Sequence, residues 1–211
     1  MTAASISRAA AAVTVVLLAA LHFIQPELNP GSRFLSDYAN GRLGWMMTLA
    51  FVAWAVATGS LAVALQRRIR TIAGRIGLGM LAIATLGLVM AALCPVDGPG
   101  APQGGTLRGM LHGVSALLGI PTVPLGAMLI SIALLRHEPS SSRRVALLAL
   151  GNLTWVTLAL MVAYMVWAMR SGVTPSAGGW MNRLLVTSYL AWTMYVAHLV
   201  KSWTTPPTAA A

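Results

Sequence analysis

The side chains of this sequence that can exchange protons lie mainly in the connections between long apolar stretches. His22, Asp37, Asp97 and His112 are the candidates for catalytic residues, because imidazole and carboxylate groups donate and accept protons. Ionisable groups are expensive in a membrane and therefore suggest a functional site there. We expect these four residues to line one cavity and to carry out acid–base chemistry.

The connections that hold these residues also supply candidates for substrate binding. They read HFIQPELNPGSRFLSDYANGRLGW at 22–45, CPVDGPGAPQGGTLRGMLHG at 94–113 and RSGVTPSAGGWMNR at 170–183. Arginine is well suited to hold a phosphate or another anionic head group. The predicted substrate-binding residues are Glu27, Arg33, Tyr38, Arg42, Arg108 and Arg183.

A structural alternative is a cap in which the arginines of these connections neutralise the acids. Phe34 and Leu35 are apolar residues among charged ones, which indicates that the first connection packs down onto the helices. We then expect Asp37 to lie within hydrogen-bonding reach of an arginine, a tyrosine or a backbone amide. The two alternatives, a ligand pocket and a structural cap, both remain open from the sequence.

The two histidines of these connections have a further alternative role. His22 and His112 each lie about one turn inside a predicted helix end on the same side. Facing each other, they could bind one b-type haem iron, since imidazole is a common axial ligand. Each could instead form a hydrogen bond with loop backbone or with an aspartate. No other metal site is predicted, and the single cysteine, Cys94, excludes an internal disulfide and a multi-cysteine metal cluster.

The composition identifies the elements that must position these residues. Hydrophobic residues make up 57% of the 211 residues and charged residues only 9%, and the mean hydropathy is +0.76. We therefore predict an all-α fold, an integral membrane bundle of six transmembrane helices that forms a single domain over residues 1–211. The predicted spans are residues 9–24, 44–66, 76–93, 109–135, 145–169 and 184–202. The apolar N-terminal run continues past Leu21 without a clear cleavage site, so we interpret it as a retained first helix.

The basic residues predict the orientation of these spans. Segments on the side of the N-terminus hold nine of the 14 arginines and lysines, and the other segments hold five. The positive-inside rule then places both termini in the cytoplasm of a cell-membrane protein. The bases lie in short loops and form no basic helix face with interleaved aromatics, so we expect no nucleic-acid partner.

Two features within the spans predict local geometry. Pro121 and Pro124 lie inside the fourth span and should kink it, because proline lacks the backbone N–H that a helix needs. Gly74, Gly77 and Gly79 begin the third span and leave room for close contact with another helix.

The run from His22 through QPELNP and RFLSDYANGRLGWMMTLAF, followed by CPVDGPGAP and LHG, resembles a bacterial membrane family known as domain of unknown function 998. The resemblance extends from about His22 to Trp203 and is most specific in the polar connections. It implies a membrane protein that usually has six helices, and it implies no particular reaction.

The polar connections and the lack of a familiar catalytic motif leave several functions open. The first is an enzyme that acts on a membrane lipid, an isoprenoid or another hydrophobic small molecule by acid–base chemistry at an outer-face pocket. The second is a redox protein that binds haem b through His22 and His112, or a quinone. The third is a transporter or an accessory subunit without catalysis. Nothing in the residues indicates an oligomeric state.

Overall fold

The computed structural model describes residues 1–172 and 176–203, and this part of the chain is all-helical. No β-strand occurs within it, which confirms the predicted all-α class. The elements are α1 (Ala3–Ile24), the 3₁₀-helix η1 (Leu35–Asn40), α2 (Trp45–Leu65), α3 (Ile72–Leu93), α4 (Leu107–Gly119), α5 (Thr122–Leu134), α6 (Ser141–Ser171) and α7 (Gly178–Ser202).

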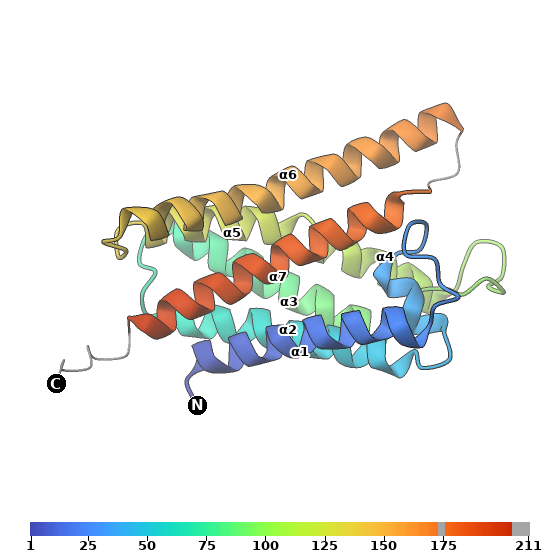
Figure 1. Cartoon of the computed structure of the whole chain (residues 1–211), viewed down its shortest axis with the longest axis horizontal. Coiled ribbons are helices and arrows are strands. Elements are labelled where there is room, and N and C mark those ends of the chain that lie inside the picture. The colour runs from blue at the N-terminus through green and yellow to red at the C-terminus, as the bar shows by residue number, and fades with distance from the viewer. Residues whose placement is uncertain (173–175, 204–211) are drawn as a thin grey trace.

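The helices form one bundle with two distinct ends (Figure 1). Segments 25–44 and 94–106 connect helices at one end, which we call the loop-rich end. Segments 66–71 and 135–140 connect helices at the other, which we call the arginine-rich end. The start of α1 and the end of α7 both lie toward the arginine-rich end (Figure 1), as the topology prediction requires. Which end faces the cytoplasm stays a prediction.

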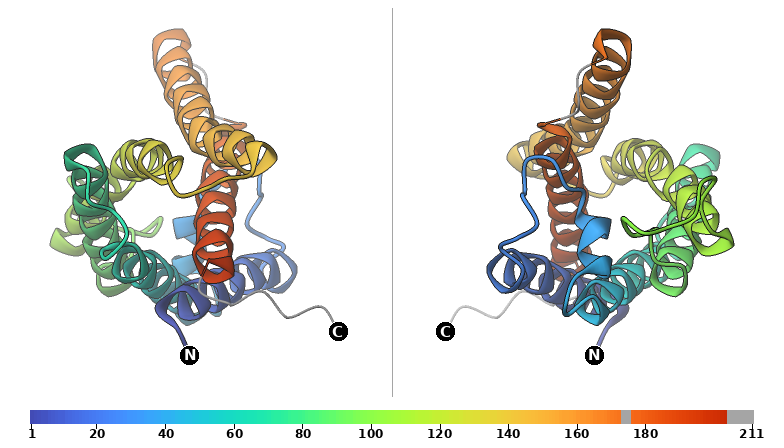
Figure 2. Two further views of the ribbon diagram at one scale, coloured as in Figure 1. Left: turned by 90° about the vertical axis from the view of Figure 1, so that its left-hand side faces the viewer. Right: turned by 90° about the vertical axis from the view of Figure 1, so that its right-hand side faces the viewer.

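In the part of the chain that the structure describes, five helical segments are long and apolar enough to cross a membrane, counting Leu107–Leu134 as one segment. The sixth predicted span, 184–202, corresponds to α7, which is helical but is not among these five. The position of α7 explains its composition, since it lies in the interior of the bundle with α1 on one side and α6 on the other (Figure 2). Thirteen of its 25 residues are buried against protein, so its polar side chains meet protein partners instead of lipid.

Capping residues place several helix starts earlier than hydropathy does. Thr2 accepts a hydrogen bond from the Ser5 amide and begins α1 at Ala3, where residue 9 was predicted. Thr71 likewise accepts a hydrogen bond from the Gly74 amide, and α3 begins at Ile72, where residue 76 was predicted. A threonine at this position accepts from amides that have no partner within the helix. The length of the apolar stretch in the sequence therefore predicts only the middle of such a helix.

The predicted fourth span is broken into α4 and α5 near Pro121, which confirms the predicted kink. Pro124 has no N–H to donate to the carbonyl of Ile120, four residues earlier. The hydroxyl of Tyr189 on α7 donates to that carbonyl instead, at 2.6 Å. The Ile120 carbonyl therefore keeps a hydrogen-bond partner despite the break.

Two of the three glycines at the start of α3 have the predicted role. A Cβ on Gly77 would lie 2.9 Å from Ile130 Cγ1 and 3.2 Å from the Gly126 carbonyl, so α3 and α5 approach closely there. A Cβ on Gly74 would lie 2.9 Å from the Ala133 Cβ. The prediction is wrong for Gly79, which has nothing within 4 Å of a Cβ because it faces away from α5.

Candidate functional site

The candidate site is a cavity of about 120 Å³, partly open to the surface, in the half of the bundle nearest the loop-rich end, and we call it the internal cavity. Its walls come from α1, η1, α2, α3, α4, α5 and α7, and most of the side chains are aliphatic or aromatic. The polar side chains in the wall are Ser36, His112, Ser115, Asn182 and Tyr189, together with the indole of Trp54. Among residues 1–172 and 176–203, none with a charged side chain lines this cavity. An apolar cavity with a few polar groups is the usual form of a small-molecule site.

His112 is held in the cavity wall through the start of α4. Thr106 caps this helix, and Asp97 accepts hydrogen bonds from the Thr106 amide at 2.8 Å and from its hydroxyl at 2.6 Å. These bonds lower the pKa of Asp97 below its usual range. A Cβ on Gly109 would lie 2.1 Å from Asp97 Oδ2, so the carboxylate sits directly against the first turn of α4. Asp97 therefore acts on the site through the position of α4.

The hydrogen bonds of His112 define which of its ring nitrogens is free. Nδ1 lies 2.9 Å from the carbonyl of Cys94 at the end of α3. A carbonyl only accepts, so Nδ1 carries the proton and a neutral ring has an accepting lone pair on Nε2. The ring also meets Phe51 edge-on, with centroids 6.0 Å apart. His112 thus offers one basic nitrogen in an apolar wall.

Trp54 supplies a hydrogen-bond donor, which complements the accepting nitrogen of His112. Its side chain is 8% exposed and lines the cavity, and its Nε1–H has no hydrogen-bond partner among the described residues. The hydroxyls of Ser115 and Tyr189 already donate to the carbonyls of His112 and Ile120. Trp54 is therefore a buried donor with an unmet hydrogen bond.

The 3₁₀-helix η1 covers one side of the cavity, and we call it the roof. Arg183 links this roof to the bundle by hydrogen bonds. Leu35 and Ser36 of η1 line the cavity, and the Leu35 amide donates to Asn182 on α7. Arg183 donates to the Tyr38 hydroxyl at 3.1 Å and to the Arg33 carbonyl at 2.8 Å. The Arg183 guanidinium is thus occupied by protein acceptors.

Asp37 has a local role in the same roof. Its Oδ2 accepts from the Phe34 amide at 2.9 Å and so caps η1. This confirms the expectation that Asp37 would have a partner. Asn40 of the first connection donates to the Asp97 carbonyl of the second, so these two connections are joined. Among the described residues, no arginine of the connections lies within 4 Å of a carboxylate oxygen of Glu27, Asp37 or Asp97, so the predicted neutralisation of these acids by arginines is wrong.

The four predicted catalytic residues do not line one cavity. His112 lines the internal cavity, His22 lines a groove between α1 and α7, and Asp37 and Asp97 meet at a surface hollow beside Arg33. Equal depth along two helices does not bring side chains together, because the rotation of each helix about its axis also matters. Among the predicted substrate-binding residues, Tyr38 is buried beneath Arg183, and Glu27, Arg33, Arg42 and Arg108 are exposed outside the internal cavity.

Haem ligation by the two histidines is not favoured by this geometry. His22 Nδ1 lies 2.6 Å from the Leu18 carbonyl, and Nε2 accepts from Arg183 Nε at 2.7 Å. Both ring nitrogens have protein partners, and His112 lines a different hollow. Among residues 1–172 and 176–203, no group of three or more His, Cys, Asp and Glu side chains is placed to hold a metal ion.

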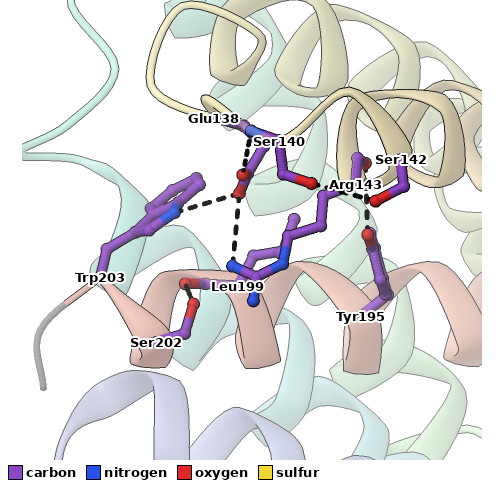
Figure 3. Close-up of polar contacts among 8 residues, drawn as sticks. All are labelled: Glu138, Ser140, Ser142, Arg143, Tyr195, Leu199, Ser202 and Trp203. Atoms are coloured by element: carbon purple, nitrogen blue, oxygen red, sulfur yellow. Dashed lines mark hydrogen bonds and ion pairs between the residues drawn. The ribbon is translucent and has the colours of Figure 1, made fainter. Parts of the chain in front are cut away.

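The arginine-rich end contains a buried acid that sequence reasoning did not assign to a site (Figure 3). Glu138 is 2% exposed and accepts from the Ser140 amide at 3.0 Å and from the Trp203 indole at 3.2 Å. Arg143 lies 4.0 Å away (Figure 3), and its backbone carbonyl accepts from Tyr195 on α7. Glu138 therefore joins the connection before α6 to the end of α7.

The fold and the cavity together define a multi-pass helical membrane protein with an internal apolar site. The chain belongs to the family described as "Protein of unknown function (DUF998)", whose model matches residues 8–199. No curated protein and no solved structure matches the chain.

Proposed function

We propose that this protein is an enzyme of the cell membrane that takes a lipid or isoprenoid molecule into the internal cavity and acts on it through His112. The observation that carries the proposal is the accepting Nε2 of His112 in a wall without charged residues. A neutral imidazole can remove a proton from a bound molecule and return it, which is the usual work of histidine in catalysis. Most of the wall is suited to an apolar body.

The other predicted catalytic residues have supporting roles in this proposal. Asp97 fixes the start of α4 and with it the position of His112. Asp37 and His22 hold the roof, one as the cap of η1 and the other as an acceptor for Arg183. The predicted cap and the predicted pocket are then parts of one arrangement, in which the cap closes the pocket.

The proposed location is the outer half of the cell membrane. The arginine-rich end contains the clusters Arg67–Arg70 and Arg143–Arg144, and we propose that this end faces the cytoplasm. The cavity then lies in the leaflet away from the cytoplasm. Its ligand comes from the membrane itself or from the space outside.

Binding is tested by filling the cavity. Ala116 lines it, whereas Val114 on the same helix is 45% exposed and does not. We expect Ala116→Phe to lose a lipid-like molecule that the wild-type protein and Val114→Phe retain through purification. Mass spectrometry of organic extracts measures this. Identical extracts from all three proteins would contradict the proposal.

The acid–base role is tested at His112. In His112→Asn the amide N–H can still donate to the Cys94 carbonyl, but the basic nitrogen is lost. The wild-type protein in D₂O should transfer deuterium from solvent to the molecule identified above, and His112→Asn should not. A His112→Asn variant that transfers deuterium at the wild-type rate would overturn the role of His112.

A further inference from the structure

We infer that the ligand of the internal cavity is an uncharged molecule with a hydroxyl group on an apolar body. This inference rests on the proposed function and specifies its substrate class. Trp54 and His112 carry it, because both residues line the cavity and each has a ring nitrogen without a hydrogen-bond partner among the described residues, a donor in Trp54 and an acceptor in His112.

The absence of charge in the wall excludes an anionic head group from the cavity. Arg33, Arg42 and Arg108 are exposed elsewhere, and Arg183 donates to protein acceptors. A diphosphate or carboxylate in this wall would lose its hydration without gaining a cation, which is strongly unfavourable. The arginines near the site therefore do not indicate an anionic substrate.

The indole of Trp54 requires an acceptor. Nε1–H can only donate, and no protein acceptor lies within reach of it among the described residues. A buried donor without a partner is costly, and an oxygen atom of a ligand would satisfy it. A pure hydrocarbon leaves this group unmet.

His112 requires a donor. Its Nδ1–H is engaged with Cys94, so Nε2 accepts. The Phe51 ring contacts His112 and lies three residues, less than one helical turn, before Trp54 on α2. Trp54 and His112 therefore line adjacent parts of the same cavity wall. A hydroxyl group is the simplest uncharged group that both accepts, as Trp54 demands, and donates, as His112 demands.

The test compares probes that differ only in the polar group. Geraniol, geranyl methyl ether, the matching hydrocarbon 2,6-dimethylocta-2,6-diene and geranyl diphosphate are titrated into the full chain in nanodiscs with ¹⁵N-labelled tryptophan. Trp54→Phe assigns the indole resonance of Trp54. Geraniol and the ether should move this proton resonance downfield, and the hydrocarbon should not. Geraniol should bind about five- to tenfold more tightly than the ether, the usual worth of one hydrogen bond. Decanol replaces geraniol in a parallel titration. The alcohol that binds more tightly shows whether the apolar body of the ligand is an isoprenoid or a straight hydrocarbon chain.

Matched variants separate the two contacts. His112→Asn should remove the advantage of geraniol over the ether, and Trp54→Phe should remove the advantage of the ether over the hydrocarbon. If Trp54→Phe does not fold, single Trp→Phe variants of the other six tryptophans assign the Trp54 resonance of the wild-type protein by elimination. Tightest binding by geranyl diphosphate, or equal binding by alcohol, ether and hydrocarbon, would overturn this inference and leave the proposed function standing. Binding of no probe, together with identical extracts from Ala116→Phe and the wild-type protein, would overturn both.

Discussion

Arg183 Nε donates a hydrogen bond of 2.7 Å to His22 Nε2 and thereby joins α7 to α1 at the loop-rich end. The same guanidinium also donates to the Tyr38 hydroxyl and to the carbonyl of Arg33. One side chain therefore links both helices to the roof of the cavity. Arginine can do this because its planar group presents five N–H donors in fixed directions.

Replacement of Arg183 should be strongly destabilising. Arg183→Met leaves His22 Nε2 and the roof acceptors without their donor, and we expect a loss of about 2–3 kcal/mol of unfolding free energy. Retention of monodisperse protein after heating in detergent measures the effect. Arg170→Met, at an exposed position in the last turn of α6, is the control and should behave as the wild-type protein. Equal stability of the two variants would show that the Arg183 contacts contribute little.

The Asp97 cap should give the protein a specific acid sensitivity. The Thr106 hydrogen bonds lower the pKa of Asp97 in the folded chain below its ordinary value of 3.8. The charged carboxylate therefore stabilises the folded state above that value, and the contribution is lost as the pH falls through the lower folded pKa. As the pH is lowered from 5 to below the folded pKa of Asp97, the melting temperature of the wild-type protein should fall more than that of Asp97→Asn. Parallel curves would contradict the cap.

Two glycines of α4 provide a matched pair for the same cap. Gly109→Ala places a methyl group where Asp97 Oδ2 lies, whereas Gly113→Ala adds one with nothing within 4 Å. Alanine favours a helix over glycine by about 1 kcal/mol, so Gly113→Ala should be neutral or stabilising. Gly109→Ala should be destabilising despite that gain, as measured by melting temperature. A stabilised Gly109→Ala variant would mean that Asp97 does not need this close approach.

Tyr189 and Pro124 should be coupled through the Ile120 carbonyl. Tyr189→Phe leaves that carbonyl without a partner and should cost about 1–2 kcal/mol. Pro124→Ala restores a backbone N–H four residues after Ile120, so Tyr189→Phe should cost less in that background. A double-mutant cycle on thermal stability measures the coupling. Additive effects would argue against this account of the break.

The two ends of the bundle should lie on opposite sides of the membrane. Reporter fusions after Ala101, at the loop-rich end, and after Ser140, at the arginine-rich end, should report different compartments. Only the Ser140 fusion should report the cytoplasm. The same location for both fusions would contradict the topology.

The sequence predicts most of the fold because hydropathy, proline and capping residues act locally. The break at Pro121 and the partner of Asp37 are of this kind. The relative positions of His22 and His112 are not local, because they depend on how each helix is rotated in the bundle. Trp54 looks like any packed tryptophan in the sequence, and only its surroundings reveal an unmet donor. The role of Glu138 likewise depends on Trp203, which is distant in the chain.

The interior position of α7 has a consequence for the order of biosynthesis. The ribosome makes this helix after α1–α6, yet it supplies Asn182 and Tyr189 to the cavity wall and the donor for the Ile120 carbonyl. We therefore expect the earlier helices to leave the position of α7 unfilled until α7 is made. The polar side chains of α7 gain their protein partners when α7 packs between the other helices. The cavity is therefore completed only when α7 is inserted.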